Sequence, residues 1–520
     1  MRKFILSIFL TFVCFTTYTY SQNIINVPAA DINSISTAIS GAAAGDILVL
    51  ERDGIYLFQG RLDVAVPLTI RAAEGSGKRP LLQQIPTDLG TYAGDPDVQI
   101  SADLTLENIH FNGSRGPLRT ISTGRAIRYA ADNLKLVVDG CVFERYWLRT
   151  IDLNAFVGCK VFYKNSLHLW DGREDRIDNG RFLDTRGSSI DSLVVVNNTF
   201  LNCNDRFIRN MGLPGIITFA KFDHNTFYGN IGYRPPFQFR TTKELVFTNN
   251  VVANVGLLGT DTLSNRKDEV GYADPAKTIC IFTVTGTDTL NTTIDMKNNV
   301  VFTESRFTEL FAINPLAVQP APLFNKEWLD RITLSEAVID EQLTFVKAPS
   351  LDSLRLDLGN YINGGTNWSN TGFTTRTEVL TPEEVNMSYG KTAAAYTAAD
   401  GYPAGDLNWY PAMKAQWEEG VDLTGLEELN GLPSDYSLEQ NYPNPFNPST
   451  DIKFNIPQSG FVTLSVYNVL GQKITELVNG ELSAGSYNYN FDASNLASGI
   501  YLYTITTNNF TQSKKMMLLK

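Results

Sequence analysis

The chain has 520 residues, of which 19% are charged, and its formal net charge is -12. This length exceeds one ordinary domain and suits a long solenoid followed by a small module. The acidic balance lacks the basic footprint of nucleic-acid-binding proteins, so we expect no nucleic-acid partner. A net negative charge is still compatible with a local basic patch that binds an acidic polymer.

Residues 1–21 have the pattern of a cleaved export signal. Arg2 and Lys3 precede an apolar core from Phe4 to Phe15, and the small residue Ser21 closes the segment. No later apolar run is long enough for a membrane-spanning helix. We therefore expect an exported protein with no transmembrane segment after the signal is removed.

A unit of strand, polar turn and strand recurs between about residues 98 and 306, with no helical periodicity inside it. Its turn carries Asn at a matching place in most copies, and the aligned positions are Asn108, Gly140, Asn165, Asn198, Asn225, Asn250 and Asn299. Units repeated every 25 to 49 residues must stack to bury their apolar faces. We predict an all-β fold in which residues 23–411 form a right-handed parallel β-helix with stacked Asn side chains. An antiparallel sandwich with coincidental turns is the alternative.

Other segments complete this picture. Residues 38–58 resemble the start of many β-helix proteins, which implies a short helix over the open end and then a first strand, and residues 328–342 predict a helical cover. Insertions at 171–182 and 256–278 interrupt the repeats and are expected to form loops on one face.

Four cysteines remain after the signal, and none belongs to a CxxC pair. Core packing is the expected role for Cys141 and Cys203. The sequence leaves any disulfide pairing among Cys141, Cys159, Cys203 and Cys280 open.

The strand after each repeat turn carries charged and aromatic residues. Because strand side chains alternate between faces, inward Ile127, Ile151, Leu183, Ile208 and Phe239 would leave two outward columns. The first outward column would contain Arg128, Asp152, Asp184, Arg209 and Arg240. The second would contain Ala126, Thr150, Phe182, Phe207 and Gln238.

These columns allow two interpretations. In the first, Arg and Asp compensate each other on a solvated sheet. In the second, they handle an acidic polysaccharide: Arg209 and Arg240 act at the catalytic position, and Asp152 with Asp184 holds Ca²⁺. The substrate-binding residues would then be Arg128, Phe182, Arg206, Phe207 and Gln238.

The segments NNTFLNCNDRFIRNMG (197–212) and FDHNTFYGN (222–230) resemble a pectin-lyase-like solenoid of the alginate lyase and chondroitinase B type. Arg209 matches that family's arginine, whereas Asn210, Met211 and Gly212 stand where the family has His-Gly. The preceding coil, GRFLDTRG (180–187), lacks the family's Lys base. The resemblance implies an acidic polysaccharide partner and β-elimination. The alternative is a non-catalytic surface binder or adhesin.

Residues 435–520 read as short alternating strands between Gly, Pro and Asn turns, which predicts a small β-sandwich after a linker at 412–434. The motifs YPNPFNP (442–448), YNVLGQ (467–472), GIYLYTI (499–505) and the basic end 514–520 closely resemble a type IX secretion system C-terminal sorting domain of type A. The resemblance implies a Bacteroidota-type bacterium, the type IX machinery as a partner, and secretion or attachment to the outer cell surface. We expect a monomer.

Overall fold

The structure is a computed structural model, and it describes most of the chain between residues 22 and 519. The parts outside the description are 1–21, 87–94, 116–120, 123, 170–171, 173–178, 213–214, 233, 262–279, 285–291, 316–317, 364–380, 400, 421–425, 430–435, 458–459, 483–484, 508–509 and 520. The expected export signal and most of both insertions therefore lie outside the described residues.

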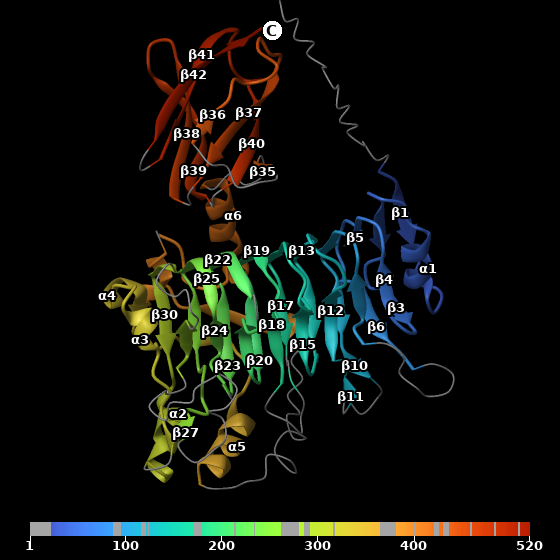
Figure 1. Ribbon diagram of the computed structural model, residues 1–520, viewed down its shortest axis with the longest axis vertical. Helices are drawn as coiled ribbons and strands as arrows, with labels where there is room; N and C mark the ends of the chain where they lie inside the picture. Colours follow the sequence, from blue (N-terminus) through green and yellow to red (C-terminus); the bar gives the residue numbers. More distant parts are fainter. Residues whose placement is uncertain are drawn as a thin grey trace, which may run out of the picture.

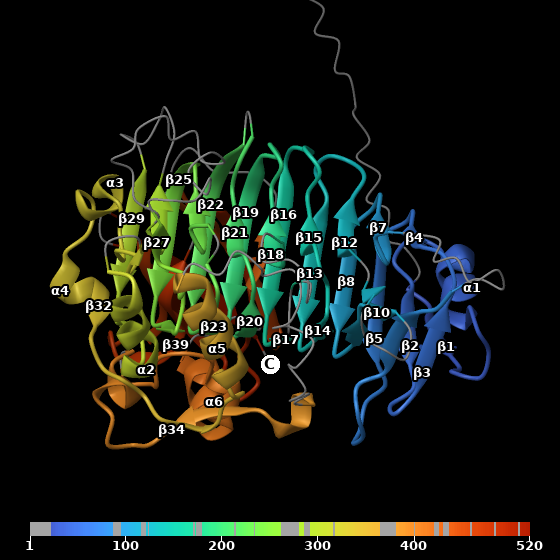
Figure 2. The ribbon, with the colours of Figure 1, turned by 90° about the horizontal axis from the view of Figure 1, so that it is seen from below.

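Three parallel sheets build the larger part of the molecule as a right-handed β-helix, and the chain visits sheet A, sheet B and sheet C in turn (Figures 1 and 2). Sheet A contains β1 (Ile24–Val27), β2 (Ile47–Leu50), β5 (Leu68–Ala72), β8 (Leu104–Glu107), β13 (Lys135–Asp139), β16 (Cys159–Lys164), β19 (Ile190–Val196), β22 (Ile216–Asp223), β25 (Thr241–Thr248) and β29 (Thr293–Lys297). Sheet B contains β3 (Ile55–Phe58), β6 (Leu81–Gln84), β9 (His110–Asn112), β14 (Val142–Glu144), β17 (Leu167–Leu169), β20 (Thr199–Cys203), β23 (Thr226–Asn230), β26 (Val251–Ala253), β30 (Asn299–Phe302) and β32 (Val338–Ile339). Sheet C contains β4 (Leu62–Val64), β7 (Val98–Ile100), β12 (Arg125–Tyr129), β15 (Arg149–Asp152), β18 (Arg181–Asp184), β21 (Arg206–Arg209), β24 (Phe237–Phe239) and β28 (Phe282–Val284). The predicted all-β solenoid is confirmed.

A ladder of buried amides runs along the corner between sheets A and B. The side-chain oxygen of Asn225 accepts hydrogen bonds from the backbone and side-chain nitrogens of Asn198, at 3.1 and 2.9 Å. Asn250 and Asn299 continue the ladder with Nδ2 to Oδ1 distances of 3.0 and 2.9 Å. The predicted stacking of Asn198, Asn225 and Asn250 at one corner is confirmed.

The residue before each ladder position takes the left-handed backbone conformation that turns the chain between the sheets. This row consists of Asn108, Gly140, Asn165, Asn197, His224, Asn249 and Asn298. The predicted alignment was therefore wrong for Asn108, Gly140 and Asn165, which belong to the left-handed row. In the ladder row Ser166 takes the place of Asn, and its backbone nitrogen donates to Asn198 Oδ1.

Aromatic side chains stack inside the solenoid, where each coil repeats its neighbour. Phe111, Phe143, His168, Phe200 and Phe227 follow one another with ring centroids 4.7 to 5.5 Å apart. His168 is thus a core residue, in agreement with the structural role that is usual for a histidine in a repeated turn. Such offset stacks add to the free energy gained by burial.

Short helices cover both ends of this core. Helix α1 (Ser34–Gly41) buries Ile35 and Ile39 against the first coil. At the other end α3 (Lys326–Leu329) and α4 (Leu334–Ala337) follow the last coils, and Trp328 packs on Phe239 and Phe282. The helix predicted within 38–58 begins earlier, at Ser34.

The chain then returns over the outer face of sheet B and builds a second apolar core there, which includes Leu201, Tyr228 and Val251. The covering elements are α2 (Ser305–Thr308), η3 (Glu309–Ile313), α5 (Asp352–Ile362), η5 (Pro382–Glu384), η6 (Ala394–Thr397) and η7 (Leu407–Trp409). Short strands join them, namely β31 (Val318–Gln319), which pairs with β27 (Thr260–Asp261), and β33 (Phe345–Lys347), which pairs with β34 (Asn386–Tyr389). Helix α6 (Pro411–Gly420) ends this part, and β10 (Ser114–Arg115) and β11 (Ile121–Ser122) form a small hairpin outside the sheets.

The C-terminal part is an antiparallel β-sandwich with its own core. One sheet contains β35 (Leu426–Leu429), β36 (Ser437–Leu438), β37 (Ser449–Ile456) and β40 (Gly485–Asp492). The other contains β38 (Gly460–Asn468), β39 (Lys473–Leu482), β41 (Gly499–Thr506) and β42 (Thr511–Leu518). The predicted small β-sandwich is confirmed.

Two further expectations concern the whole chain. Cys141, Cys159, Cys203 and Cys280 are buried free thiols, so the structure forms no disulfide among them. Within the described residues, no helix is both long and apolar enough to cross a bilayer.

Candidate functional site

Two rows of polar side chains run along the outer face of sheet C, across strands β12, β15, β18, β21 and β24. Strand pairing aligns Arg125 with Arg149 and Arg181 with Arg206, and it aligns Asp152 with both Arg128 and Asp184. Arg209 lies beside Asp184 and Gln238. With Asp205, which directly precedes β21, these residues are called the charged face. It consists of Arg125, Arg128, Arg149, Asp152, Arg181, Asp184, Asp205, Arg206, Arg209 and Gln238.

Outward residues are three apart in these strands because two successive residues between them point into the core. The backbone nitrogens of Phe207 and Ile208 both donate to the carbonyl oxygen of Pro236, at 2.9 and 3.2 Å, as in a β-bulge. Phe182 and Phe207 are consequently buried in the aromatic core, at 1% and 0% exposure. The prediction that these two rings face outward and stack on sugar rings is wrong.

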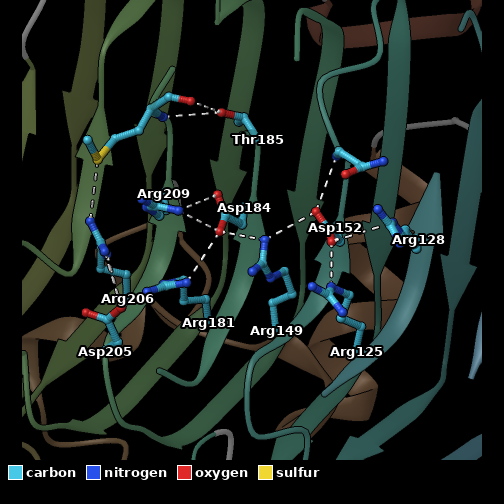
Figure 3. Close-up of polar contacts among 12 residues, drawn as sticks. Arg125, Arg128, Arg149, Asp152, Arg181, Asp184, Thr185, Asp205, Arg206 and Arg209 are labelled. Carbon is cyan, nitrogen blue, oxygen red and sulfur yellow. Dashed lines mark hydrogen bonds and ion pairs between the residues drawn. The ribbon is translucent and has the colours of Figure 1, made fainter. Parts of the chain in front are cut away.

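Asp184 is the centre of the charged face (Figure 3). Its carboxylate is 2.9 Å from a guanidinium nitrogen of Arg149, 3.0 Å from one of Arg209 and 3.4 Å from one of Arg181. Burial alone would raise the pKa of Asp184, but the three arginines outweigh burial and lower it. Asp184 is therefore a buried anion at neutral pH.

Asp152 links Asp184 to the next coil. Arg149 spans the two carboxylates and lies 3.3 Å from Oδ1 of Asp152. Arg125 approaches Oδ2 of Asp152 to 2.7 Å and also pairs with Asp95, and Arg128 is 4.0 Å away. The network therefore extends across several coils.

Asp205 anchors the other side of the charged face. Arg181, Arg206 and Arg234 approach its carboxylate to 2.7, 3.3 and 3.5 Å. Burial would raise the pKa of Asp205, but these arginines lower it. Arg206 also donates to Gln238 Oε1 at 2.5 Å and has no exposed surface. Arg206 therefore positions Asp205 and Gln238, and direct contact of its side chain with a polymer is excluded in this conformation.

Burial changes the arginines as well. It lowers the pKa of Arg149 to about 10 and the pKa of Arg206 to about 9, although the neighbouring aspartates oppose the change. Both groups nevertheless remain protonated at neutral pH.

Arg128 and Arg209 are the most exposed arginines of the charged face. Their side chains are 30% and 20% exposed, and Arg125 follows at 19% but is held between Asp95 and Asp152. The Nε atoms of Arg128 and Arg209 are themselves buried, so the exposed surface lies on other atoms of each side chain. An exposed guanidinium can bind a planar carboxylate.

The predicted calcium site does not fit the donor set. Ca²⁺ requires six to eight oxygen ligands, whereas each carboxylate of Asp152 and Asp184 is surrounded by three guanidinium groups. A cation placed there would meet like charge.

Arg240 does not take the place predicted for it. Gln238 pairs with Arg209, and Arg240 lies two residues further along the chain, beyond the end of β24. The inward residue opposite Ile208 is likewise Phe237 and not Phe239. No strand of sheet C carries a lysine, and Lys221 lies on sheet A in contact with Asp223.

Arg125, Arg149, Arg181 and Asp205 were not predicted as site residues from the sequence. A signal was present, because pairs of charged residues three positions apart recur in four successive coils. These pairs are Arg125 with Arg128, Arg149 with Asp152, Arg181 with Asp184, and Arg206 with Arg209. Strict two-residue alternation hid them.

Comparison with known proteins identifies the C-terminal part. Residues 440–519 match the family model of the secretion system C-terminal sorting domain. This segment is a type IX sorting domain. The protein is therefore secreted, and proteins that carry this domain are often attached to the outer cell surface. The search of curated proteins found no match for the chain.

Proposed function

We propose that the charged face of sheet C binds an acidic polysaccharide outside the cell. The observation that carries this proposal is the local charge. The charged face contains six arginines and three aspartates, which leaves a formal excess of three positive charges on a protein of net charge -12. A positive region on an acidic surface attracts polyanions selectively.

The spacing of the exposed arginines supports a polymeric ligand. Arg128 and Arg209 are separated by Asp152 and Asp184 in one row, so three strand spacings of about 4.8 Å lie between them. Carboxylates along a polyuronate also recur at a regular interval. When a uronate carboxylate binds, Arg209 would turn part of its guanidinium from Asp184 to that carboxylate. Arg209 would therefore face a negative charge both before and after binding.

Binding without cleavage is the function that the geometry supports best. β-Elimination requires a base that removes a proton from the carbon beside the carboxylate. Arg149 and Arg206 have lowered pKa values but remain cations held by aspartates, and sheet C has no lysine. The charged face thus supplies carboxylate binding and no evident base, which favours the surface binder over the lyase.

Affinity electrophoresis of the protein in gels that contain polygalacturonate, alginate or hyaluronan tests the proposal. We expect retardation by at least one of these polymers and none by neutral dextran. The same polymers are then incubated with the protein and followed by ultraviolet absorbance for unsaturated uronates. A rise in absorbance would show that the protein cleaves the polymer as a lyase and does not only bind it. An absence of retardation by all acidic polymers at low salt would overturn the proposal.

A further inference from the structure

The turn between β38 and β39 of the sorting domain presents two aliphatic side chains to solvent. Val469 is 68% exposed and Leu470 is 79% exposed. Hairpin turns usually carry Gly, Asn, Asp, Pro or Ser, because these residues suit the backbone and the solvent. Exposed aliphatic residues at this position point to a partner.

Hydrogen bonds hold this turn in one shape. Oδ1 of Asn468 accepts from the backbone nitrogens of Leu470 and Gln472, both at 3.0 Å. Its Nδ2 donates to Oε1 of Gln472 at 2.7 Å, and Gly471 takes the left-handed conformation that the turn requires, with φ of 76°. A turn that is already ordered loses little conformational entropy on binding.

Two more apolar side chains are exposed at the same end of the sheet. Asn468 pairs with Tyr501, so Ile500, which is 40% exposed, lies beyond the end of β38. Leu519 follows Leu518, the partner of Gly499, and is 51% exposed. We call Val469, Leu470, Ile500 and Leu519 the apolar tip. Exposed apolar groups gathered at one place mark interaction sites.

The rest of the protein is attached at the opposite end of the sandwich. The first strand of the sandwich, β35, runs from the middle of β40, where Leu426 pairs with Tyr489, to Leu429 opposite Ser486. The next strand, β36, pairs Ser437 with Asn455, beside the Ile456–Gly485 pair at the far end from the apolar tip, and Figure 1 shows the C-terminus at the outer end of the domain.

We propose that the apolar tip is the part of the sorting domain that docks into an apolar pocket of a protein of the secretion machinery. The segment 440–519 that matches the sorting domain contains every residue of the apolar tip, so the tip belongs to the part of the chain that directs secretion. It does not depend on polysaccharide binding by sheet C.

Secretion of the full chain by a bacterium with a working type IX system tests this assignment. In a Val469→Asp/Leu470→Asp variant we expect the secreted fraction to fall about tenfold or more, as when anchors of an interface are replaced. The folded protein should accumulate inside the outer membrane. Phe461→Asp is the matched control, because Phe461 is 44% exposed on the same strand but at the opposite end, and its secretion should be unchanged.

Three further readouts keep the test decisive. The double variant should keep the unfolding midpoint of Phe461→Asp and the polymer binding of the wild type; if it unfolds earlier, Val469→Ser/Leu470→Ser is used in its place with the same expected loss of secretion. Secretion of either tip variant at the level of Phe461→Asp would overturn the proposal. A Leu470-dependent dimer in sedimentation, together with normal secretion, would show a self-contact and would also overturn it.

Discussion

The Asn corner and the charged face belong to the same coils but are stabilised in different ways. At the corner, identical amides in successive coils satisfy one another, because each Asn is both a donor and an acceptor. On the charged face, like residues also align in successive strands, but the stabilising contacts are ion pairs that cross from the arginine row to the aspartates of the other row, so each carboxylate pairs with arginines of more than one coil. Repetition of one amide therefore builds the corner, whereas pairing of opposite charges between two rows builds the candidate site.

Removing one charge from the charged face should break it more severely than any single change at the corner. Asp184→Ala leaves Arg149, Arg181 and Arg209 without their shared buried anion, so we expect a loss of about 3–5 kcal/mol of stability. Urea unfolding at pH 7 measures the loss.

Asp63→Ala is the control for this change, because Asp63 belongs to the same row of sheet C but is 56% exposed at its side chain. We expect an effect within about 1 kcal/mol for this exposed ion pair. Equal effects of the two substitutions would mean that the network around Asp184 does not stabilise the fold.

Breaking the amide ladder should cost somewhat less. Asn225→Leu removes the acceptor of two Asn198 donors and the donor to Asn250, so we expect a loss of roughly 1–3 kcal/mol in urea unfolding. Asn165→Gly is the control, since Asn165 belongs to the left-handed row, in which Gly140 already occurs, and it should change stability by about 1 kcal/mol or less. A neutral Asn225→Leu would contradict the buried ladder.

Asp406 is a buried aspartate with no arginine among its hydrogen-bond partners in the described residues, and it can be compared with Asp184 and Asp205 on the charged face. Asp406 directly precedes η7 and accepts hydrogen bonds from Asn408 and from Thr199 of sheet B, and burial raises its pKa to about 6. A raised carboxyl pKa favours folding at low pH, and this contribution is lost as the pH rises from about 4 to 6. Asp406→Asn should therefore gain about 2–3 kcal/mol relative to wild type between pH 4 and pH 7.

Asp184 and Asp205 should act in the opposite direction. Their lowered pKa values contribute stability that is present above the ordinary carboxyl pKa and is lost as the pH falls below it. Urea unfolding midpoints of wild type and Asp406→Asn, measured between pH 3 and pH 7, separate the contribution of Asp406 from that of Asp184 and Asp205. Parallel pH profiles of the two proteins would contradict the raised pKa of Asp406.

The sequence was sufficient to predict the solenoid and the sandwich, because turn residues and apolar strands repeat at recognisable intervals. It was insufficient for the charged face at two points. Strict alternation placed Phe182 and Phe207 outside, whereas the bulge at Phe207 and Ile208 puts two successive side chains inside. Nothing in the sequence indicated that Gln238 rather than Arg240 would lie beside Arg209, since the pairing depends on the turn before β24.

The most direct test of function comes from the exposed arginines. Arg128→Ala/Arg209→Ala should lower stability less than Asp184→Ala, because Asp184 keeps Arg149 and Arg181 as charge partners. Its affinity for the acidic polymer that retards the wild type should fall about tenfold at low salt. The difference between the two proteins should shrink as added salt screens the charges. Equal binding by the variant and the wild type at every salt concentration would contradict a binding site on the charged face.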